Sequence, residues 1–323
     1  MPLVTVLTPV YNGEKYLEEC IESVLAQSFR NWEYILVNNC STDRSLAIAM
    51  AYAKKDARIR VVTNERFVGV IENHNNAFSQ VSISSKYCKL VAADDRLAPA
   101  CLERMVELAE AHPTAAIVGC YQQCGSEVLW KGLPIGQPVF PGRQVCRGAL
   151  LNGLEVFGTP TSLLFRSDLV RSNQPFFPHN QPHADTSACF HYLEKHDFGF
   201  VYEVLCEHRV HADQASTKLI ALGARNVACI DHLITYGPVF LDAMELKSRK
   251  KRLFEEYYRW LGGCLLKVRG KIFWKFQIAR LRDLGYPIVW GKVIAAMLNE
   301  IFIELRNPWL ATKKIVSMIK GKI

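Results

Sequence analysis

Short polar segments follow apolar runs in the N-terminal third of the chain, and some carry side chains that could bind a ligand. Asp94 and Asp95 come directly after Val91-Ala92-Ala93. Adjacent carboxylates at the end of a buried strand suit a hard divalent cation such as Mg2+ or Mn2+ that bridges to a diphosphate. A helix cap near Pro99 or an ion pair with Arg96 is the competing interpretation, and these residues alone favour neither.

A second polar group, Asn38-Asn39, follows the apolar run Tyr34–Val37. A carboxamide offers one acceptor and two donors, so it can read the planar edge of a nucleobase. Asn is also common in a plain strand-to-helix turn, which is the alternative here. Ser41 and Asp43, just beyond, are better suited to cap the next helix.

Two further candidates lie in the second half of the chain. Asp185 opens a helical pattern, where a carboxylate could accept a proton from an acceptor hydroxyl, although helix capping is the simpler explanation from spacing alone. His211 follows an apolar run and could ligate a metal or bind phosphate. A single His after a strand is more often an ordinary surface residue.

Alternating strands and helices must position these side chains. Apolar runs predict strands over Val4–Leu7, Tyr34–Val37, Ile59–Val62, Tyr87–Ala92 and Ala115–Cys120, with amphipathic stretches between them. This alternation is typical of a parallel sheet wrapped by helices. Ligands bind such sheets at the carboxyl ends of the strands, where the segments Thr8–Asn12, Asn38–Asp43 and Asp94-Asp95 fall.

The pattern changes after Gly125. It predicts helices near Val145–Leu151 and over Asp185–Glu194, a strand over Phe200–Cys206, and helical segments from about Ala228 to the end. Polar residues interrupt the most apolar stretch, Val289–Ile303. No segment has the roughly 18 uninterrupted apolar residues of a membrane span, so we expect none.

Composition narrows the class of protein. The chain has 323 residues and 50% are hydrophobic, which excludes a disordered, collagenous or disulfide-framed protein. Residues 1–246 hold 21 basic and 26 acidic side chains, whereas residues 247–323 hold 18 basic and 5 acidic ones. A basic tail of this kind indicates an anionic membrane surface, a nucleic-acid surface or a solvated face.

The cysteines and the absent motifs exclude further classes. Eleven cysteines show no pairing pattern and no signal peptide precedes them, so we expect reduced thiols in a cytoplasmic protein, without zinc. The chain lacks the GxGxxG and P-loop sequences of dinucleotide and phosphate sites. It also lacks the GxSxG elbow of serine hydrolases and the HExxH motif of zinc proteases.

The order of the motifs resembles that of family 2 glycosyltransferases. The resemblance is carried by residues 4–17 (VTVLTPVYNGEKYL), 23–29 (SVLAQSF), 32–43 (WEYILVNNCSTD), 72–77 (ENHNNA) and 89–95 (KLVAADD). It is strong over about residues 3–120, weaker to about 216 and absent beyond. It implies an α/β protein with a GT-A fold, in which helices flank a mixed, mainly parallel sheet and a helical C-terminal region follows.

The resemblance also implies that different parts of the chain have different functions. Residues 1–220 would form the GT-A domain, with a nucleotide-sugar-binding half (1–120) and an acceptor half (121–220), followed by a basic helical region (221–323). The family uses a nucleotide-sugar donor, here with a UDP-sugar favoured, a divalent Mn2+ or Mg2+, and usually inverts the anomeric carbon. Its acceptors are often lipid-linked or growing bacterial polysaccharides.

Site residues follow from matching this sequence to the family's motifs. Thr8, Pro9 and Tyr11 would line the nucleoside pocket, Asn38 and Asn39 would hold the base, and Asn75 would also bind the donor. Asp94 and His211 would bind the metal, with Asp95 beside them. Asp185 would be the catalytic base.

Two departures from the family leave other functions open. The family usually has two Asp at Asn38-Asn39 and a further Asp at Ala92, so a non-catalytic nucleotide-sugar-binding homologue is one alternative. A nucleotidyltransferase is another, because it also pairs carboxylates with a metal, although the first loop lacks its basic, Gly-rich sequence.

The basic C-terminal region adds an expectation about partners and location. It fits peripheral docking at the inner face of the cell membrane, where cell-surface polysaccharide or lipopolysaccharide is built. Packing of the same helices on the core with basic outer faces explains the charge equally well. We expect no nucleic-acid partner.

Overall fold

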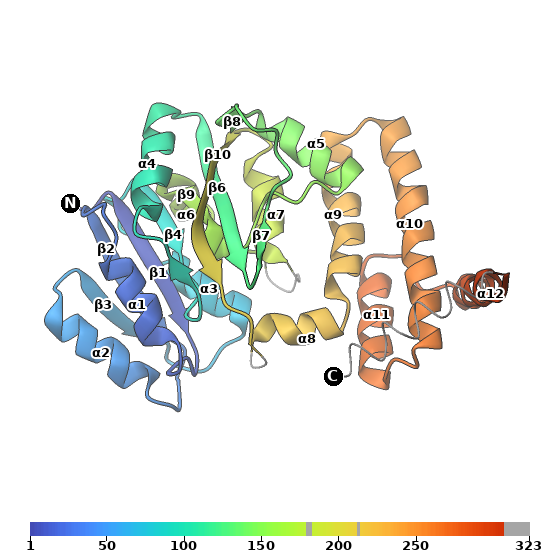
Figure 1. Cartoon of the computed structure of the whole chain (residues 1–323), viewed down its shortest axis with the longest axis horizontal. Coiled ribbons are helices and arrows are strands. Elements are labelled where there is room, and N and C mark those ends of the chain that lie inside the picture. Colours follow the sequence, from blue (N-terminus) through green and yellow to red (C-terminus); the bar gives the residue numbers. More distant parts are fainter. Residues whose placement is uncertain (179–182, 212–213, 307–323) are drawn as a thin grey trace. The chain divides into compact units, whose positions relative to one another are not determined.

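The computed structural model describes residues 1–178, 183–211 and 214–306. The chain forms two compact units, Met1–Gln214 and the chain from Ala215 onward. The sequence-based boundary after residue 220 falls within helix α8 (Ala215–Ala221), which opens the second unit. Figure 1 shows the described strands gathered in the first unit and the long helices in the second.

Strands and helices alternate in the first half of the first unit. Its strands are β1 (Val4–Val10), β2 (Trp32–Asn38), β3 (Ile59–Thr63), β4 (Tyr87–Leu90), β5 (Arg96–Leu97), β6 (Ala115–Cys124), β7 (Glu127–Leu129), β8 (Val139–Phe140), β9 (Leu163–Arg166) and β10 (Asp197–His208). Its helices are α1 (Leu17–Leu25), α2 (Ser45–Lys55), α3 (Val70–Phe78), α4 (Cys101–Ala111), α5 (Gly142–Asn152), α6 (Ser167–Ser172) and α7 (Ala184–Tyr192), with a 3-10 turn at Pro160–Ser162.

One mixed sheet contains these strands, in the order β3-β2-β1-β4-β9-β6-β10-β5, with β7 paired to β6 and β8 to β10. The ladders β1–β2, β2–β3, β1–β4 and β6–β10 are parallel. Strand β9 enters antiparallel between β4 and β6. The segments that follow β1, β2 and β4 therefore leave the sheet at the same edge, as the sequence predicts.

Strand β1 is buried along its whole length, as a central strand covered on both faces should be. Its ladder with β4 ends at the pair Leu7–Leu90, two residues before Pro9. Proline has no N–H to donate, so it is tolerated where the neighbouring strand has already ended. Beyond this point β1 and the chain after β4 are no longer paired, which leaves room for polar side chains at the sheet edge.

Helices cover both faces of the sheet. On one face, Val4, Val6 and Val10 of β1 share a core with apolar side chains of α1, α2 and α4. On the other face, Phe78 of α3 packs against a group of aromatic rings, with centroid distances of 4.6–6.1 Å to Phe165, Phe176 and Phe177. The sheet is thus a rigid support for the loops at its edge.

The predicted strands are confirmed and most are longer by one to four residues. The strand predicted over Tyr87–Ala92 is the exception: β4 ends at Leu90, and Ala92 N donates to Thr161 Oγ1 instead of to β1. Asp43 stabilises the start of α2, because its Oδ1 accepts a hydrogen bond from Ser45 N at 2.9 Å. Helix α3 was not predicted, since its polar residues obscure an apolar face. Ser41 serves the preceding loop instead, where its Oγ accepts from Asn12 N at 3.1 Å.

The second unit is helical throughout its described part. Its helices are α8 (Ala215–Ala221), α9 (Ala224–Phe240), α10 (Ala243–Leu266), α11 (Lys271–Asp283) and α12 (Trp290–Arg306). A capping box starts α10: Asp242 Oδ1 accepts from Glu245 N at 2.8 Å, and Asp242 N donates to Glu245 Oε2 at 3.2 Å. None of the helices in the described residues has both the length and the apolarity needed to cross a bilayer.

Candidate active site

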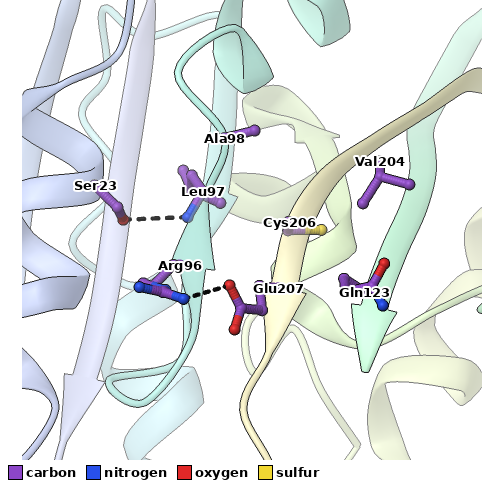
Figure 2. A pocket seen from close by; sticks show the side chains of 8 residues that line it. All are labelled: Ser23, Arg96, Leu97, Ala98, Gln123, Val204, Cys206 and Glu207. Carbon is purple, nitrogen blue, oxygen red and sulfur yellow. Dashed lines mark hydrogen bonds and ion pairs between the residues drawn. The ribbon is translucent and has the colours of Figure 1, made fainter. Parts of the chain in front are cut away.

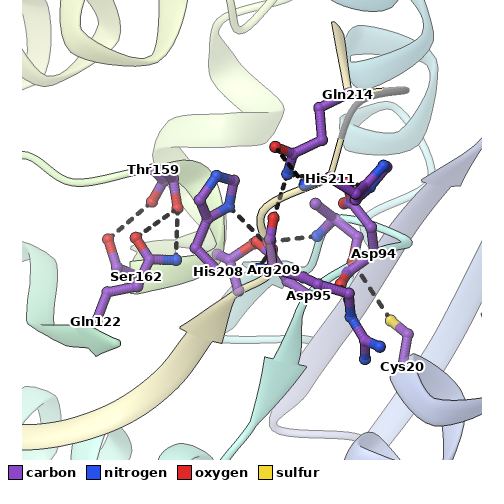
Figure 3. Close-up of polar contacts among 12 residues, drawn as sticks. Cys20, Asp94, Asp95, Gln122, Thr159, Ser162, His208, Arg209, His211 and Gln214 are labelled. Carbon is purple, nitrogen blue, oxygen red and sulfur yellow. Dashed lines mark hydrogen bonds and ion pairs between the residues drawn. The ribbon is translucent and has the colours of Figure 1, made fainter. Parts of the chain in front are cut away.

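The segment after β4 meets the segment after β10 at the edge of the sheet. Asp94 Oδ2 and His211 Nε2 lie 3.0 Å apart, although 117 positions separate them in sequence. Both side chains are partly accessible, with 28% of Asp94 and 14% of His211 exposed. Figure 3 shows these two side chains together with Arg209 and Gln214. The structure therefore brings together the two residues that the sequence assigns to metal binding.

Asp95 points the other way and is only 1% exposed. Its Oδ2 accepts from Thr161 Oγ1 at 2.5 Å, and its Oδ1 accepts from His208 Nδ1 at 3.0 Å and from Arg209 N at 3.3 Å. The hydrogen bond to Asp95 raises the pKa of His208 above its ordinary value. With both oxygens engaged, Asp95 fastens the loop to β10 and to the turn before β9, whereas the Asp94 side chain faces His211.

Arg209 anchors the same region from the surface. Its Nε donates to Asp94 O at 3.1 Å, and its NH1 and NH2 groups donate to Glu19 at 3.2 and 2.8 Å. This hydrogen bond from Arg209 holds the pKa of Glu19 below its ordinary value. The guanidinium also lies 4.7 Å from the centroid of the Tyr16 ring, which in turn lies 4.5 Å from the His211 ring. Arg209 thus keeps Asp94 and His211 in register.

The Asp94–His211 pair fits a divalent cation. Two neighbouring ligands of an octahedral ion, each about 2.1 Å from it, lie about 3 Å from one another. A carboxylate oxygen and an imidazole nitrogen are both ligands that Mn2+ accepts. Among the described residues, no group of three or more His, Cys, Asp or Glu side chains is placed to hold a metal ion. The remaining positions would therefore fall to water and to phosphate oxygens, as is usual for Mg2+ in nucleotide sites.

Asn39 uses its carboxamide inside the protein. Nδ2 donates to Val68 O at 2.8 Å, while Oδ1 accepts from Val68 N and from Asn64 Nδ2, both at 3.0 Å. Asn38 is less fully engaged: its Oδ1 accepts from Ser41 N at 3.1 Å, and its Nδ2 lies 3.5 Å from Thr63 Oγ1. A base read by Asn39 would have to displace the Val68 backbone, so Asn38 is the freer of the two.

Asn75 on α3 also uses its carboxamide to bind a backbone segment of the protein. Asn75 Nδ2 donates to Phe177 O at 2.9 Å, and Asn75 Oδ1 accepts from Phe177 N at 2.8 Å. Its neighbour His74 stacks on the Phe177 ring with centroids 6.1 Å apart. Burial lowers the pKa of His74, which favours a neutral imidazole at pH 7. Asn75 therefore fixes the segment that leads toward Asp185.

Asp185 lies in the first turn of α7, where its Oδ1 accepts from Thr186 N at 2.8 Å. Burial raises the pKa of Asp185 above its ordinary value of 3.8. Positive charge on His183 or His74 opposes that rise, which places Asp185 in one electrostatic group with α3. A carboxylate with a raised pKa next to neutral imidazole is chemically able to accept a proton.

The three residues assigned to the nucleoside pocket differ in their surroundings. Thr8 is fully buried, and its hydroxyl lies 2.9 Å from Tyr34 OH in the core, so only its backbone is free to face a ligand. Pro9 lies two residues beyond the last β1–β4 pair. Tyr11 is 48% exposed and its ring lies 4.6 Å from that of Phe67, which is 57% exposed. Tyr11 and Phe67 form the accessible aromatic pair here.

A cavity of about 360 Å³ adjoins this region, between α1 and the strands β5, β6 and β10. Figure 2 shows its lining residues Ser23, Arg96, Leu97, Ala98, Gln123, Val204, Cys206 and Glu207. Arg96 NH2 donates to Glu207 at 2.6 Å, and Arg96 NH1 donates to Glu19 at 3.1 Å. Glu19 also accepts hydrogen bonds from Arg209, which donates to the backbone of Asp94. A series of hydrogen bonds therefore links this cavity to Asp94.

Several residues of the site are not evident from the sequence. Thr161 and His208 hold Asp95, Arg209 holds Asp94, and Gln214 is within 3.5 Å of Asp94 Oδ2. The buried Gln122 on β6 in turn donates to Thr159 Oγ1 at 3.0 Å and so supports the turn that carries Thr161. The available signal was the cluster of polar residues between Cys206 and Gln214, directly after a predicted strand.

Solved structures share this fold. S. aureus TarS in complex with UDP-GlcNAc matches with a TM-score of 0.60 and 16% identity, over 80% of this chain and 73% of that one. The mannosyltransferase PcManGT from Pyrobaculum calidifontis, in complex with GDP-Man and Mn2+, matches with a TM-score of 0.58 and 17% identity, over 97% and 83%. The mixed sheet, its flanking helices and the helical C-terminal region are thus confirmed as a GT-A-like fold.

Curated relatives match the sequence itself. An uncharacterized glycosyltransferase of Haemophilus influenzae is 26% identical over 233 residues, which cover 67% of this chain and 68% of the relative. The putative teichuronic acid biosynthesis glycosyltransferase TuaG of Bacillus subtilis is 39% identical over 106 residues, 33% of this chain and 41% of the relative. The second match thus spans less than half of that relative's length.

A family model assigns the chain to a family. The model of glycosyl transferase family 2 matches residues 5–172, which is more than half of the chain. The match includes β1, β2 and the Asp94-Asp95 loop at the sheet edge, the elements on which the resemblance in sequence depends. The chain therefore belongs to glycosyltransferase family 2.

Proposed function

We propose that the protein transfers a glycosyl group from a nucleoside-diphosphate sugar to a hydroxyl acceptor, with inversion at the anomeric carbon. The observation that carries the proposal is the 3.0 Å approach of Asp94 and His211 at the edge of a family 2 sheet. The solved neighbours bind UDP-GlcNAc and GDP-Man. We favour a UDP-sugar donor for this chain.

In the proposed site, Asp94 and His211 hold a Mn2+ or Mg2+ ion. When bound, such an ion neutralises the negative charge that develops on the leaving nucleoside diphosphate. Asp95, Thr161 and Arg209 keep Asp94 in position through the hydrogen bonds described above. Tyr11 and the backbone at the end of β1 border the nucleoside, with Asn38 at the base and Asn75 supporting the wall of the pocket near the diphosphate.

Asp185 is the proposed general base. It would accept the proton of the acceptor hydroxyl as that oxygen attacks the anomeric carbon and the bond to the diphosphate breaks. The raised pKa of its carboxyl supports this role, because a stronger base accepts a proton more readily. A single displacement of this kind inverts the configuration at the carbon. The proposed acceptor half is residues 121–220, after the donor half 1–120.

The proposed biological setting is the synthesis of a bacterial cell-surface polysaccharide on the cytoplasmic side of the membrane. TuaG, a relative by sequence, is described as a putative teichuronic acid biosynthesis enzyme. The acceptor would then be a growing glycan or a lipid-linked sugar. A second candidate function, binding a nucleotide sugar without transfer, gains support from Asn39, whose carboxamide is occupied by Val68.

A thermal-shift screen distinguishes these functions. UDP, GDP, dTDP and CMP are each added with and without Mn2+, and a ligand that binds only the folded state raises Tm by mass action. We expect one nucleotide to stabilise the protein in a Mn2+-dependent way, and Asp94→Asn to abolish the Mn2+ dependence. The control is Asp43→Asn, which changes a carboxylate that accepts hydrogen bonds from Ser45 N and Glu14 N and has no proposed role in binding the ion.

The screen is followed by turnover of the matching nucleotide sugar. Release of nucleoside diphosphate with wild-type protein, lost in Asp94→Asn and Asp185→Asn, supports the transferase. Binding without turnover over a wide range of acceptors points to the non-catalytic homologue. No shift with any nucleotide contradicts both functions.

A further inference from the structure

The second unit carries an unbalanced run of positive charge. From residue 257 to residue 282 the chain has seven basic side chains and no acidic one. The basic residues are Arg259, Lys267, Arg269, Lys271, Lys275, Arg280 and Arg282. Upstream, acidic residues lie among the basic ones, and Arg249 and Arg252 both pair with Glu256, at 3.2 and 3.7 Å. Within the run from 257 to 282 no acidic residue is present, and Arg280 pairs outside it, with Asp231 at 3.2 Å.

Large apolar side chains are exposed in the middle of this run. Residues 267–270 connect α10 to α11, and together with Leu266 at the end of α10 and Lys271 and Ile272 at the start of α11 they form what we call the 266–272 loop. Val268 is 86% exposed, Ile272 77% and Leu266 37%. Lys267, Arg269 and Lys271, which alternate with them, are exposed too. Apolar and basic side chains thus share one short, accessible stretch.

The backbone keeps Val268 exposed. Val268 has a φ of +49°, a left-handed conformation that is unfavourable for a β-branched residue. Its N–H donates to Leu265 O at 3.1 Å, so the turn that ends α10 holds the side chain in this place. An exposed apolar side chain at a strained position does nothing for folding, which suggests that it has a partner.

Aromatic rings lie next to the loop. Trp274 on α11 packs on Trp290 of α12 with ring centroids 5.3 Å apart, and Trp290 is 44% exposed. Tryptophan is enriched where a protein meets the interface between lipid headgroups and acyl chains. The combination of aliphatic tip, alternating cations and a nearby Trp pair matches the composition of an interfacial membrane anchor.

We propose that the 266–272 loop docks on an anionic lipid bilayer. Val268 and Ile272 would enter the boundary between headgroups and acyl chains, and Lys267, Arg269 and Lys271 would contact the lipid phosphates. A second copy of this chain is a poorer partner, because its matching loop carries the same charge. Nucleic acid is also a poorer partner, because exposed Val and Ile side chains would remain in water.

The test measures co-sedimentation of the full chain with vesicles. One set contains phosphatidylcholine alone and the other phosphatidylcholine with an equal amount of phosphatidylglycerol. We expect binding to the anionic vesicles only, weakened by added salt. The triple variant Lys267→Gln, Arg269→Gln, Lys271→Gln should bind on the order of 100-fold more weakly. The double variant Val268→Gly, Ile272→Ser should lose at least about ten-fold at unchanged net charge.

The matched control is Lys54→Gln, Lys131→Gln, Lys195→Gln, which removes the same charge from exposed positions of the first unit. It should bind vesicles as the wild type does. Equal binding to neutral vesicles, or full binding by both loop variants, overturns the proposal. Binding to a short DNA duplex but not to vesicles overturns it in favour of nucleic acid. Nucleotide-induced thermal shifts, measured on the same variants without lipid, test the transferase site separately.

Discussion

At the scale of single residues, Asp185 combines a functional role with a cost in stability. Burial raises its pKa, so the ionised form needed for a general base is disfavoured in the folded protein. Transfer should therefore decline as the pH is lowered through this raised pKa. We expect Asp185→Asn to reduce turnover by about 10²- to 10⁴-fold, the usual contribution of a general base.

The same substitution has an opposite effect on stability. Because the folded-state pKa lies above the unfolded value, the ionised carboxyl makes the protein less stable as the pH rises above about 3.8. Asn can still accept the hydrogen bond from Thr186 N. Asp185→Asn should therefore raise Tm at neutral pH, and the difference should vanish in acid. An equal loss of activity and of Tm would instead indicate a structural role.

The two neighbouring asparagines offer a second residue-level prediction. Asn39→Asp keeps the acceptor for Val68 N but removes the donor to Val68 O, leaving a buried carbonyl opposite a carboxylate. We expect a loss of about 1–3 kcal/mol in urea unfolding. Asn38→Asp is the control, because its stronger contact uses Oδ1 as an acceptor for Ser41 N. Similar losses of stability at both positions would contradict a special role for the hydrogen bonds between Asn39 and the Val68 backbone.

At the scale of elements, the sequence predicts what depends on local pattern. Strands β1, β2 and β4 are recognisable because each is a short, mainly apolar run followed by a polar segment. Helix α3 is not, because Asn73 and Asn75 are buried on the face that apolar residues usually occupy. The antiparallel insertion of β9 between β4 and β6 depends on contacts with distant strands, so no local pattern reveals it.

The crossing of α10 and α12 gives an element-level prediction. A Cβ on Gly262 would lie 2.7 Å from Met297 N, whereas a Cβ on Gly263 would meet nothing within 4 Å. Gly262→Ala should therefore force the two helices apart and destabilise the second unit by about 1–3 kcal/mol. Gly263→Ala should stabilise α10 by about 0.5–1 kcal/mol, since glycine disfavours a helix. Circular dichroism melting of both variants compares them directly.

At the scale of the whole molecule, the two units have opposite charge and different proposed roles. Every residue assigned to donor binding or catalysis lies in Met1–Gln214, whereas the basic run lies in the chain from Ala215 onward. A nucleotide with Mn2+ should therefore raise one of two calorimetric transitions and leave the other in place. Gly262→Ala should lower the transition that the nucleotide does not raise. A single transition that moves with both would show that the units unfold together.

The candidate active site could be predicted in part from the sequence. The resemblance places Asp94 and His211 in one function, and the structure brings their side chains within 3.0 Å. Thr161, His208 and Arg209 hold the Asp94-Asp95 loop through hydrogen bonds between residues that are 66–115 positions apart in sequence. No sequence motif predicts such contacts. The hydrogen bonds between the Asn39 side chain and the Val68 backbone also connect residues far apart in sequence. The same carboxamide would be needed to bind a base, so the sequence alone does not decide between the two roles.

The pairing of Asp94 with His211 also bears on how the protein is made. Translation delivers β1 to β4 and Asp94 long before β10, His211 and Gln214. Residues 5–172, the span that the family model matches, contain the carboxylate but not the imidazole. A nascent chain therefore has no complete form of the proposed cation-binding pair until residue 211 has left the ribosome and β10 has joined β6. Incomplete products of synthesis would be unable to engage the donor in the proposed way.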